Sequence, residues 1–423
     1  MRDFSIGPFE PNRLAAQDYV KNRLMLSFCM PRQKPLWALL VALLLVACQP
    51  SPPAPPPLDL DPDEIATSVA ATLSALQTQA ATATPTPLPD ILPHSLYFLS
   101  QSAGSLQIWR LERNGHDLSQ VTDHDDSVLD FDLHRPSGAL VYTTGANLIH
   151  IASDGGLQSW GLQEPDQALP AIGRQISSPR ISPDGRWLAY ADNGLRLIHL
   201  SSGETQLLLA NEWQQLEDGS LIPQRLFFPA SWSPDGKQLL VSIAYLEAGS
   251  LAFLNLQSGA LTEFQASGIV CCQTTWAANS ASLYVASPYL GLIDSGLWRY
   301  FVADGREELL IPSTEEDATV NLVGWPLALP DGGLRFFYAE TAGIPEGDTP
   351  LLMASARAGA WRQPQALRED AFQIQDALWA PDGSLAVILP TLQGQPGPLI
   401  LAHEDGRPLQ LLVDAAWNLR WGP

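Results

Sequence analysis

One short motif recurs along the chain and constrains the fold more than any other feature. In the segment 230–242 an apolar run enters Ser-Pro-Asp-Gly and a second apolar run leaves it. Pro234 presets the first turn position, Asp235 can bond back to its own backbone, and Gly236 accepts a left-handed backbone. This chemistry predicts a tight corner between two antiparallel strands.

Imperfect copies of this corner recur at 182–185, 329–332 and 380–383, with degraded versions at 135–138 and 277–280. A second kind of corner, short and containing glycine, alternates with the first. It occurs at Gly115, Gly155, Gly203, Gly259, Gly305, Gly359 and Gly406. The mean interval between these glycines is roughly 48 residues, which is a repeat length to be considered before any strand is assigned.

Each repeat contains four short strands, as in 187–191, 195–200 and 205–209 after an inner strand that ends at the first corner. Four strands in a repeat of this length are typical of a β-propeller blade. Two packed β-sandwiches, the other all-β interpretation, would not place uniform corners at a uniform interval.

The ends of the chain predict how the ring closes. The segment 96–99 begins with a second-strand pattern, whereas the chain ends in an inner-strand pattern at 416–423. The C-terminal strand therefore completes the first blade and removes an open sheet edge. We predict an all-β, seven-bladed β-propeller of four-stranded blades. The expected inner strands lie near Phe131, Arg180, Ser231, Thr275, Gly324, Ala377 and Leu419.

The segment 181–190, Ile-Ser-Pro-Asp-Gly-Arg-Trp-Leu-Ala-Tyr, resembles the WD-type repeat of TolB-like propellers. The resemblance covers about residues 95–423 and implies the propeller fold. Two departures limit it, because the second and fifth blades lack an intact motif and seven blades exceed the six of TolB. The partners of TolB are therefore not transferred.

The N-terminal segment predicts where the protein is located. Twelve apolar residues at 36–47 follow Arg32 and Lys34 and precede Cys48. This run is shorter than the roughly 20 residues that span a bilayer, but it fits a signal peptide. Leu-Val-Ala-Cys at 45–48 resembles a bacterial lipobox, so we expect residues 1–47 to be a lipoprotein signal peptide and Cys48 to be lipidated. The true start could be Met25 or Met30.

The expected location is the cell envelope, with the protein lipid-anchored and extracytoplasmic, on the outer face of the cell membrane or on the outer membrane. Residues 48–60 form a Pro-rich tether. A capped apolar stripe predicts a helical spacer at 61–82, which could also support oligomerisation. A Thr/Pro linker at 83–93 precedes the propeller at 94–423.

The net charge of −22 disfavours nucleic acid as a ligand and leaves the N-terminal lipid as the expected membrane contact. We find none of the common catalytic motifs, and we expect no cofactor and no metal. Asp123–Asp126, with Asp130 and Asp132, could hold a cation, but a solvated acidic loop is the preferred interpretation. Cys271 and Cys272 could form a vicinal disulfide or act as small apolar residues.

The long connections all fall on one face of the predicted propeller, at 211–228, 288–296, 341–350 and 390–398. Binding residues concentrate on such loops. Gly219 could turn an extra hairpin within 211–228, and we expect that hairpin to stand above the central channel. The candidate binding residues on this face are Trp213, Glu217, Asp218, Arg225, Phe227, Tyr289 and Asp294.

These observations favour a non-enzymatic function: a membrane-anchored extracytoplasmic binding or scaffolding protein. Its partner would be an envelope protein, a peptide or a glycan, bound by the long-loop face. The alternative is an extracytoplasmic propeller hydrolase or lyase acting on a glycan or peptide at the central channel. Three or more carboxylates or histidines converging at the channel mouth would favour the enzyme.

Overall fold

The computed structural model describes residues 88–423, with gaps at 103, 162–168, 171–174, 246–248, 265–272, 288–295, 315–318, 346–348 and 393–394. The chain divides into two units, Met1–Thr86 and Pro87–Pro423. The predicted signal peptide, Cys48, the tether and the helical spacer lie outside the described residues. So do Cys271, Cys272, Tyr289 and Asp294.

Seven sheets, which we call blades 1 to 7, make up the described part of the chain. The strands of each blade are named in order from the inner to the outer one. Blade 1 contains β30 (Trp417–Trp421), β1 (Leu96–Ser102), β2 (Ser105–Leu111) and β3 (Leu118–Gln120). Blade 2 contains β4 (Asp130–His134), β5 (Ala139–Thr143), β6 (Asn147–Ile151) and β7 (Leu157–Gly161). Blade 3 contains β8 (Ser177–Ile181), β9 (Trp187–Ala191), β10 (Gly194–His199) and β11 (Thr205–Ala210).

Blade 4 contains β13 (Leu221–Trp232), β14 (Gln238–Ala244), β15 (Gly249–Asn255) and β16 (Leu261–Glu263), with β12 (Glu212–Gln215) added to β13. Blade 5 contains β17 (Gln273–Trp276), β18 (Ser282–Ser287), β19 (Gly296–Phe301) and β20 (Glu307–Pro312). Blade 6 contains β21 (Thr319–Ala328), β22 (Leu334–Ala342), β23 (Leu351–Ala356) and β24 (Gln365–Phe372). Blade 7 contains β25 (Ile374–Trp379), β26 (Leu385–Leu392), β28 (Leu399–His403) and β29 (Gln410–Val413), with β27 (Gln395–Pro396) paired to β26.

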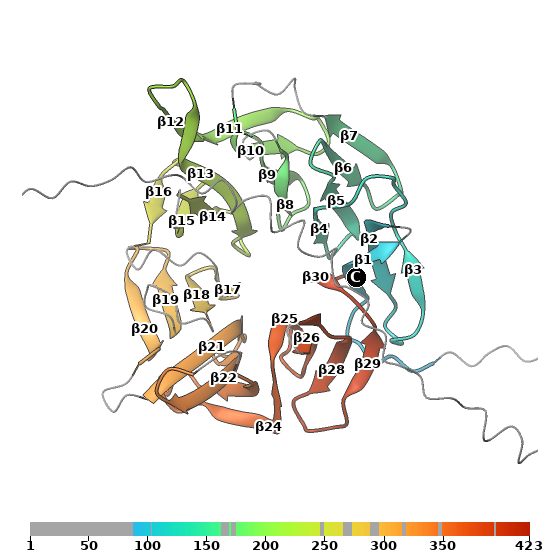
Figure 1. The fold of residues 1–423 in the computed structure, drawn as a ribbon, viewed down its shortest axis with the longest axis vertical. Helices are drawn as coiled ribbons and strands as arrows, with labels where there is room; N and C mark the ends of the chain where they lie inside the picture. Colours follow the sequence, from blue (N-terminus) through green and yellow to red (C-terminus); the bar gives the residue numbers. More distant parts are fainter. Residues whose placement is uncertain are drawn as a thin grey trace, which may run out of the picture. The chain divides into compact units, whose positions relative to one another are not determined.

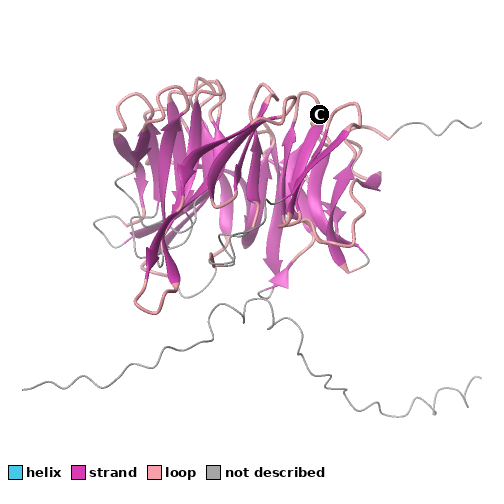
Figure 2. Ribbon diagram, turned by 90° about the horizontal axis from the view of Figure 1, so that it is seen from above, coloured by secondary structure: helices cyan, strands magenta, loops and turns pink. Residues whose placement is uncertain are grey.

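The blades are arranged radially in a ring, and the first strand of each blade lies nearest the middle (Figure 1). Seen from the side, the strands run between two layers of loops (Figure 2). β30 pairs antiparallel with β1, so the last strand of the chain completes blade 1. The predicted fold class, the seven blades and the closing strand are confirmed. Within the described residues, no helix is present that could cross a membrane.

The Ser-Pro-Asp-Gly corner is closed by its own side chains. The Ser182 hydroxyl donates to Asp184 Oδ1 (2.6 Å) and accepts from the Trp187 backbone N–H (2.9 Å). Gly185 adopts a φ of 69°, a left-handed conformation that glycine reaches without steric cost. The serine therefore ties the corner to the first residue of the outgoing strand, and Ser233 does the same in blade 4.

The hydrophobic core consists of layers between neighbouring blades. Each of the seven clusters of buried apolar side chains draws on two adjacent blades, and together they cover every junction of the ring. Between blades 3 and 4, for example, Leu195 packs with Leu239 and Val241. A single blade buries neither of its faces alone, so the stability of each blade depends on its neighbours.

Tryptophans at the ends of inner strands bond neighbouring blades to one another. The indole Nε1–H of Trp421 in blade 1 donates to the carbonyl of Trp379 in blade 7 (2.7 Å). Trp379 donates to the carbonyl of Trp325 in blade 6 (2.8 Å), and Trp232 in blade 4 donates to that of Arg180 in blade 3 (2.9 Å). These bonds link blades near the middle of the ring.

We predict that Trp421→Phe destabilises the protein by about 1–3 kcal/mol beyond its loss of volume, because the buried Trp379 carbonyl loses its donor. The matched control is Trp109→Phe, since the Nε1 of Trp109 is buried without a hydrogen-bond partner in the described part of the chain. Urea unfolding of both variants measures the difference. Equal destabilisation of the two would show that the Trp421 bond contributes nothing.

Candidate functional site

The extra hairpin expected within 211–228 is present. β12 pairs antiparallel with the first part of β13, from Glu212 opposite Arg225 to Gln215 opposite Leu221. Gly219 closes the turn with a φ of 84°, and its N–H donates to the Leu216 carbonyl (2.9 Å). The prediction that Gly219 turns a hairpin is confirmed.

The position expected for this hairpin is wrong. Figure 1 places β12 at the outer rim of the ring, away from its middle. The contacts explain why: Arg225 Nη2 pairs with Glu263 of the outer strand β16 (3.0 Å), and Trp213 Nε1 donates to Asn193 Oδ1 of blade 3 (3.2 Å). These two contacts hold the hairpin against the outer strand of blade 4 and the β9–β10 turn of blade 3.

The predicted binding residues of the hairpin divide into a frame and a tip. Phe227 is buried in the core between blades 3 and 4, and Arg225 lies over its ring, 5.1 Å from the centroid. Trp213 is half-buried, whereas Glu217 and Asp218 are exposed. Hydrogen bonds from the Ser220 side chain and backbone lower the pKa of Asp218, so its carboxylate stays ionised. The tip, defined as Leu216, Glu217 and Asp218, is exposed to solvent.

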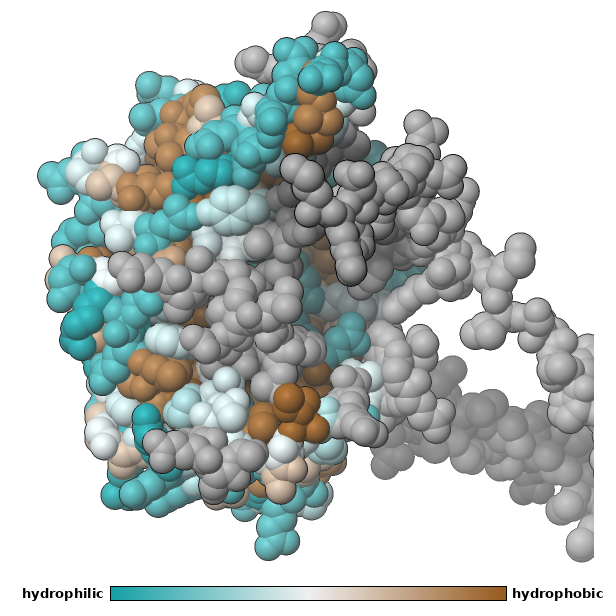
Figure 3. Space-filling view, turned by 60° about the vertical axis from the view of Figure 1, so that its left-hand side comes forward, coloured by the Kyte–Doolittle hydropathy of each residue, from teal (hydrophilic) through white to brown (hydrophobic). Residues whose placement is uncertain are grey.

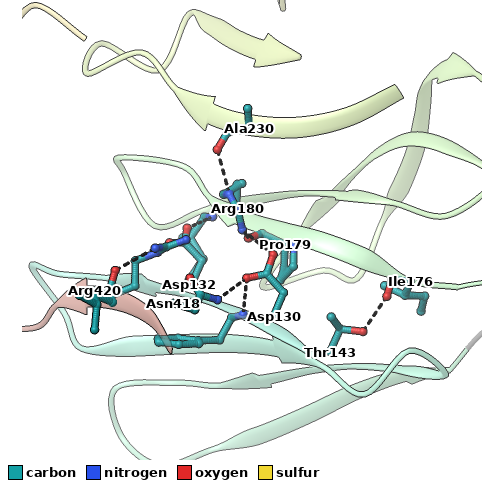
Figure 4. A network of polar contacts seen from close by, with 12 residues as sticks. Asp130, Asp132, Thr143, Ile176, Pro179, Arg180, Ala230, Asn418 and Arg420 are labelled. Carbon is teal, nitrogen blue, oxygen red and sulfur yellow. Dashed lines mark hydrogen bonds and ion pairs between the residues drawn. The ribbon is translucent and has the colours of Figure 1, made fainter. Parts of the chain in front are cut away.

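A polar network joins the inner strands of blades 1, 2 and 3 (Figure 4). Asp130 Oδ2 pairs with Arg180 Nη1 (3.0 Å), and Asp130 Oδ1 accepts from Asn418 Nδ2 (2.6 Å). Asn418 has a φ of 53° at an irregularity in the pairing of β30. Asparagine tolerates this left-handed geometry better than most residues, and the conformation lets the side chain reach blade 2.

Asp132 forms the second half of the network. Its Oδ2 accepts from the Ile181 backbone N–H (2.8 Å), and its Oδ1 lies 3.5 Å from Arg420 Nε. Arg180 is held from the other side by the Ala230 carbonyl, which accepts from its Nε (2.9 Å). Burial alone would lower the pKa of Arg180, but Asp130 and Asp132 outweigh it and raise the pKa.

The acidic segment 123–126 does not gather with Asp130 and Asp132 into a cation site. His124 bonds to the Tyr142 hydroxyl, and both aspartates are engaged by arginines. In the described part of the chain, no group of three histidine, cysteine or acidic side chains is arranged to hold a metal.

A third inner-strand carboxylate, Asp376 of blade 7, is partly buried. Its Oδ1 accepts from the Trp325 indole (3.2 Å) and from the Ala377 backbone N–H (2.8 Å). Burial raises the pKa of Asp376, although both hydrogen bonds and the Arg420 charge act in the opposite direction. All three carboxylates therefore accept hydrogen bonds from the protein. Among the residues that the structure describes, no histidine or second carboxylate is bonded to any of the three for proton transfer.

Arg180, Arg420, Asn418 and Asp376 were not among the binding residues predicted from the sequence. A signal was nevertheless present. Arg180 and Arg420 each take the position before the last residue of an inner strand, and Asp132 lies two residues before the end of its own. Charged residues near equivalent positions of neighbouring repeats are brought together by the ring, and an alignment of the repeats on their corners would have grouped them.

Comparisons with known proteins support the propeller fold and no particular function. No protein-family model matches the chain, and no curated protein sequence matches it. An oligogalacturonate lyase in complex with manganese has a TM-score of 0.50 and 13% identity, covering 77% of this chain and 86% of that chain. A functionally unknown protein from Desulfotomaculum acetoxidans DSM 771 has a TM-score of 0.50 and 11% identity, covering 78% and 99%. TolB from Acinetobacter baumannii scores 0.40 with 15% identity, covering 78% and 82%.

We predict that Asp376→Asn stabilises the protein at pH 7, and that the gain disappears as the pH falls towards 4. The pKa of Asp376 is raised in the folded state, so its ionised form costs stability above the unfolded pKa and the cost is relieved below it. Asparagine keeps the Oδ1 acceptor without the charge. Urea midpoints measured from pH 4 to pH 7 provide the test.

Asp405→Asn is the control, and we expect it to destabilise the protein at pH 7, opposite to Asp376→Asn. A hydrogen bond from Arg407 lowers the pKa of Asp405, so its ionised form adds stability above the unfolded pKa and this is lost as the pH falls. An Asp376→Asn variant less stable than the wild type at pH 7 would contradict the burial argument.

Proposed function

We propose that this chain is a membrane-anchored, extracytoplasmic binding or scaffolding protein, and that the tip of the β12–β13 hairpin belongs to its partner surface. The observation that carries the proposal is the hairpin itself, an insertion in one blade with a rigid frame and an exposed tip. The two ion pairs of Arg225, to Glu212 and Glu263, and the Trp213 bond to Asn193 hold the frame. A preorganised loop loses little entropy on binding.

The surface composition supports a partner that contacts a protruding element. On the face drawn in Figure 3, hydrophobic areas are small and lie between larger hydrophilic areas. Leu216 is 40% exposed beside Glu217 and Asp218. One apolar side chain next to two carboxylates suits a protein, peptide or glycan surface with a basic or polar rim.

The hydrolase or lyase alternative has less support. The chain shares a propeller fold with the oligogalacturonate lyase, but an identity of 13% supports a shared fold and not a shared activity. The inner-strand carboxylates Asp130 and Asp132 are each paired with an arginine. We therefore prefer binding over catalysis.

Site-specific photocrosslinking in intact cells tests the binding surface. A photoreactive side chain at Leu216 should give a discrete adduct, and one at Leu157, which is 63% exposed on the outer strand of blade 2, should not. Glu217→Lys with Asp218→Lys should reduce the Leu216 adduct by about threefold or more, since rim charges steer association. Glu204→Lys, an exposed charge reversal at another corner, is the matched control. The same adducts from both positions would overturn the proposal.

The anchor rests on Cys48, and mass spectrometry of the mature protein tests it. We expect an N-terminal Cys48 carrying a lipid, with residues 1–47 removed, because the apolar run and the lipobox-like cysteine fit that processing. Cys48→Ser should leave the precursor unprocessed. A mature protein that retains 36–47, or begins with an unmodified residue, would contradict the anchor.

A further inference from the structure

A pocket of about 430 Å³ opens where the inner strands of blades 1 to 4 end. Its walls come from the corner after β4, the corner after β8, the end of β13 and Arg420 of β30. This volume lies within the range of about 300–1,000 Å³ typical of small-molecule sites. The pocket is on the side of the short corners, so it is separate from the hairpin and does not rest on the proposed function.

Arginines outnumber acidic residues in the lining of this pocket, whereas acidic residues outnumber basic ones in the whole chain. Arg135, Arg180 and Arg420 line it, with Asp132 as the only acidic lining residue among the described ones. The whole chain carries a net charge of −22. Guanidinium groups stay protonated throughout the biological pH range, so these three side chains are cationic at every relevant pH. Asp130 and Asp132 offset the charge of Arg180 and Arg420, and Arg135 adds a cation at the mouth.

Arg180 is oriented by contacts that leave one edge of its guanidinium free. Nε donates to the Ala230 carbonyl (2.9 Å), and Nη1 donates to the Pro179 carbonyl (2.6 Å) and to Asp130 (3.0 Å). Within the described residues, no acceptor is bonded to Nη2. The side chain is 18% exposed, so the group is fixed in place yet reachable from the pocket.

Arg420 has a similar arrangement. Its Nη1 donates to the Leu419 carbonyl (2.8 Å), and its Nε faces Asp132 Oδ1 at 3.5 Å. Its Nη2 also has no acceptor in the part of the chain that the structure describes. Arg420 is 31% exposed, and Arg135 is fully on the surface. Three guanidinium groups on three neighbouring blades therefore face one pocket.

The aspartates position these arginines and are themselves occupied. Asp130 accepts from Asn418 and from the Phe131 backbone N–H (2.8 Å), and Asp132 accepts from the Ile181 backbone N–H. The donors that remain point to an acceptor with several oxygens and a negative charge. Arginine forks match carboxylate and phosphate oxygens in charge and in geometry.

We propose that this pocket is a binding site for a small ligand that carries a carboxylate or phosphate group. The oxyanion binds between Arg180 and Arg420, and Arg135 at the mouth attracts it from solvent. The remainder of the ligand packs on Leu133, Ile181 and Trp232, which form the apolar part of the wall.

Isothermal titration of the purified full-length protein at low ionic strength tests the site, with inorganic phosphate in one arm and citrate in the other. We expect saturable binding of one molecule per chain for at least one of the two. Tighter binding of phosphate assigns the natural group as a phosphate, and tighter binding of citrate assigns it as a carboxylate. Saturable binding of neither anion overturns the proposal.

Variants locate the site. Arg420→Gln should weaken binding about tenfold, as expected when a charged hydrogen-bonding group is lost. Arg135→Gln, at an exposed position whose loss leaves the fold intact, should weaken it about threefold. Arg407→Gln removes the same charge from an exposed corner of blade 7 and is the matched control. If Arg407→Gln weakens binding as much as Arg135→Gln, the effect is one of overall charge and the assigned site is wrong.

Discussion

The indole hydrogen bonds between inner strands are the interaction on which the ring depends. In the described part of the chain, neighbouring blades share no β-sheet pairing, so apolar layers hold them together, and such layers alone fix no register. Trp232, Trp379 and Trp421 each donate to a backbone carbonyl of the preceding blade. A directional bond between the inner strands of two neighbouring blades limits how far one strand can slide along the other, because a buried indole N–H without an acceptor is costly.

The polar network continues this function where the pattern of tryptophans is interrupted. Blades 2 and 3 end their inner strands with His134 and Ile181 in place of tryptophan, and the isoleucine side chain has no group to donate. At these junctions Asp132 accepts from the Ile181 backbone, and Asp130 accepts from Asn418 of blade 1. Ion pairs and hydrogen bonds from amide groups thus replace the indole hydrogen bonds. They leave charged groups on the inner strands of the ring.

The sequence predicts the repeat well because corners are local. Pro-Asp-Gly chemistry is encoded within four residues, and Gly219 turns its hairpin for the same local reason. The hairpin's position was not predictable in this way, because it depends on Glu263 and Asn193, which lie far from Arg225 and Trp213 in sequence. The Asp130–Arg180–Asn418 cluster was missed for a related reason. Its members come from three repeats, and ring closure brings residues 130 and 418 together.

Both proposed sites lie where blades depart from the repeat. In the repeat, a tryptophan at the end of the inner strand bonds the neighbouring blade, and a Pro-Asp-Gly corner turns the chain into the next strand. The hairpin adds β12 to the inner strand of blade 4. The pocket lies at the ends of the inner strands of blades 1 to 4, where blades 2 and 3 have histidine and isoleucine in place of tryptophan. His134, Ile181 and the arginines beside them line the pocket together with Trp232 of blade 4. Function lies in sites grafted on a fold, so in a repeat fold the positions that depart from the repeat are where such sites are expected.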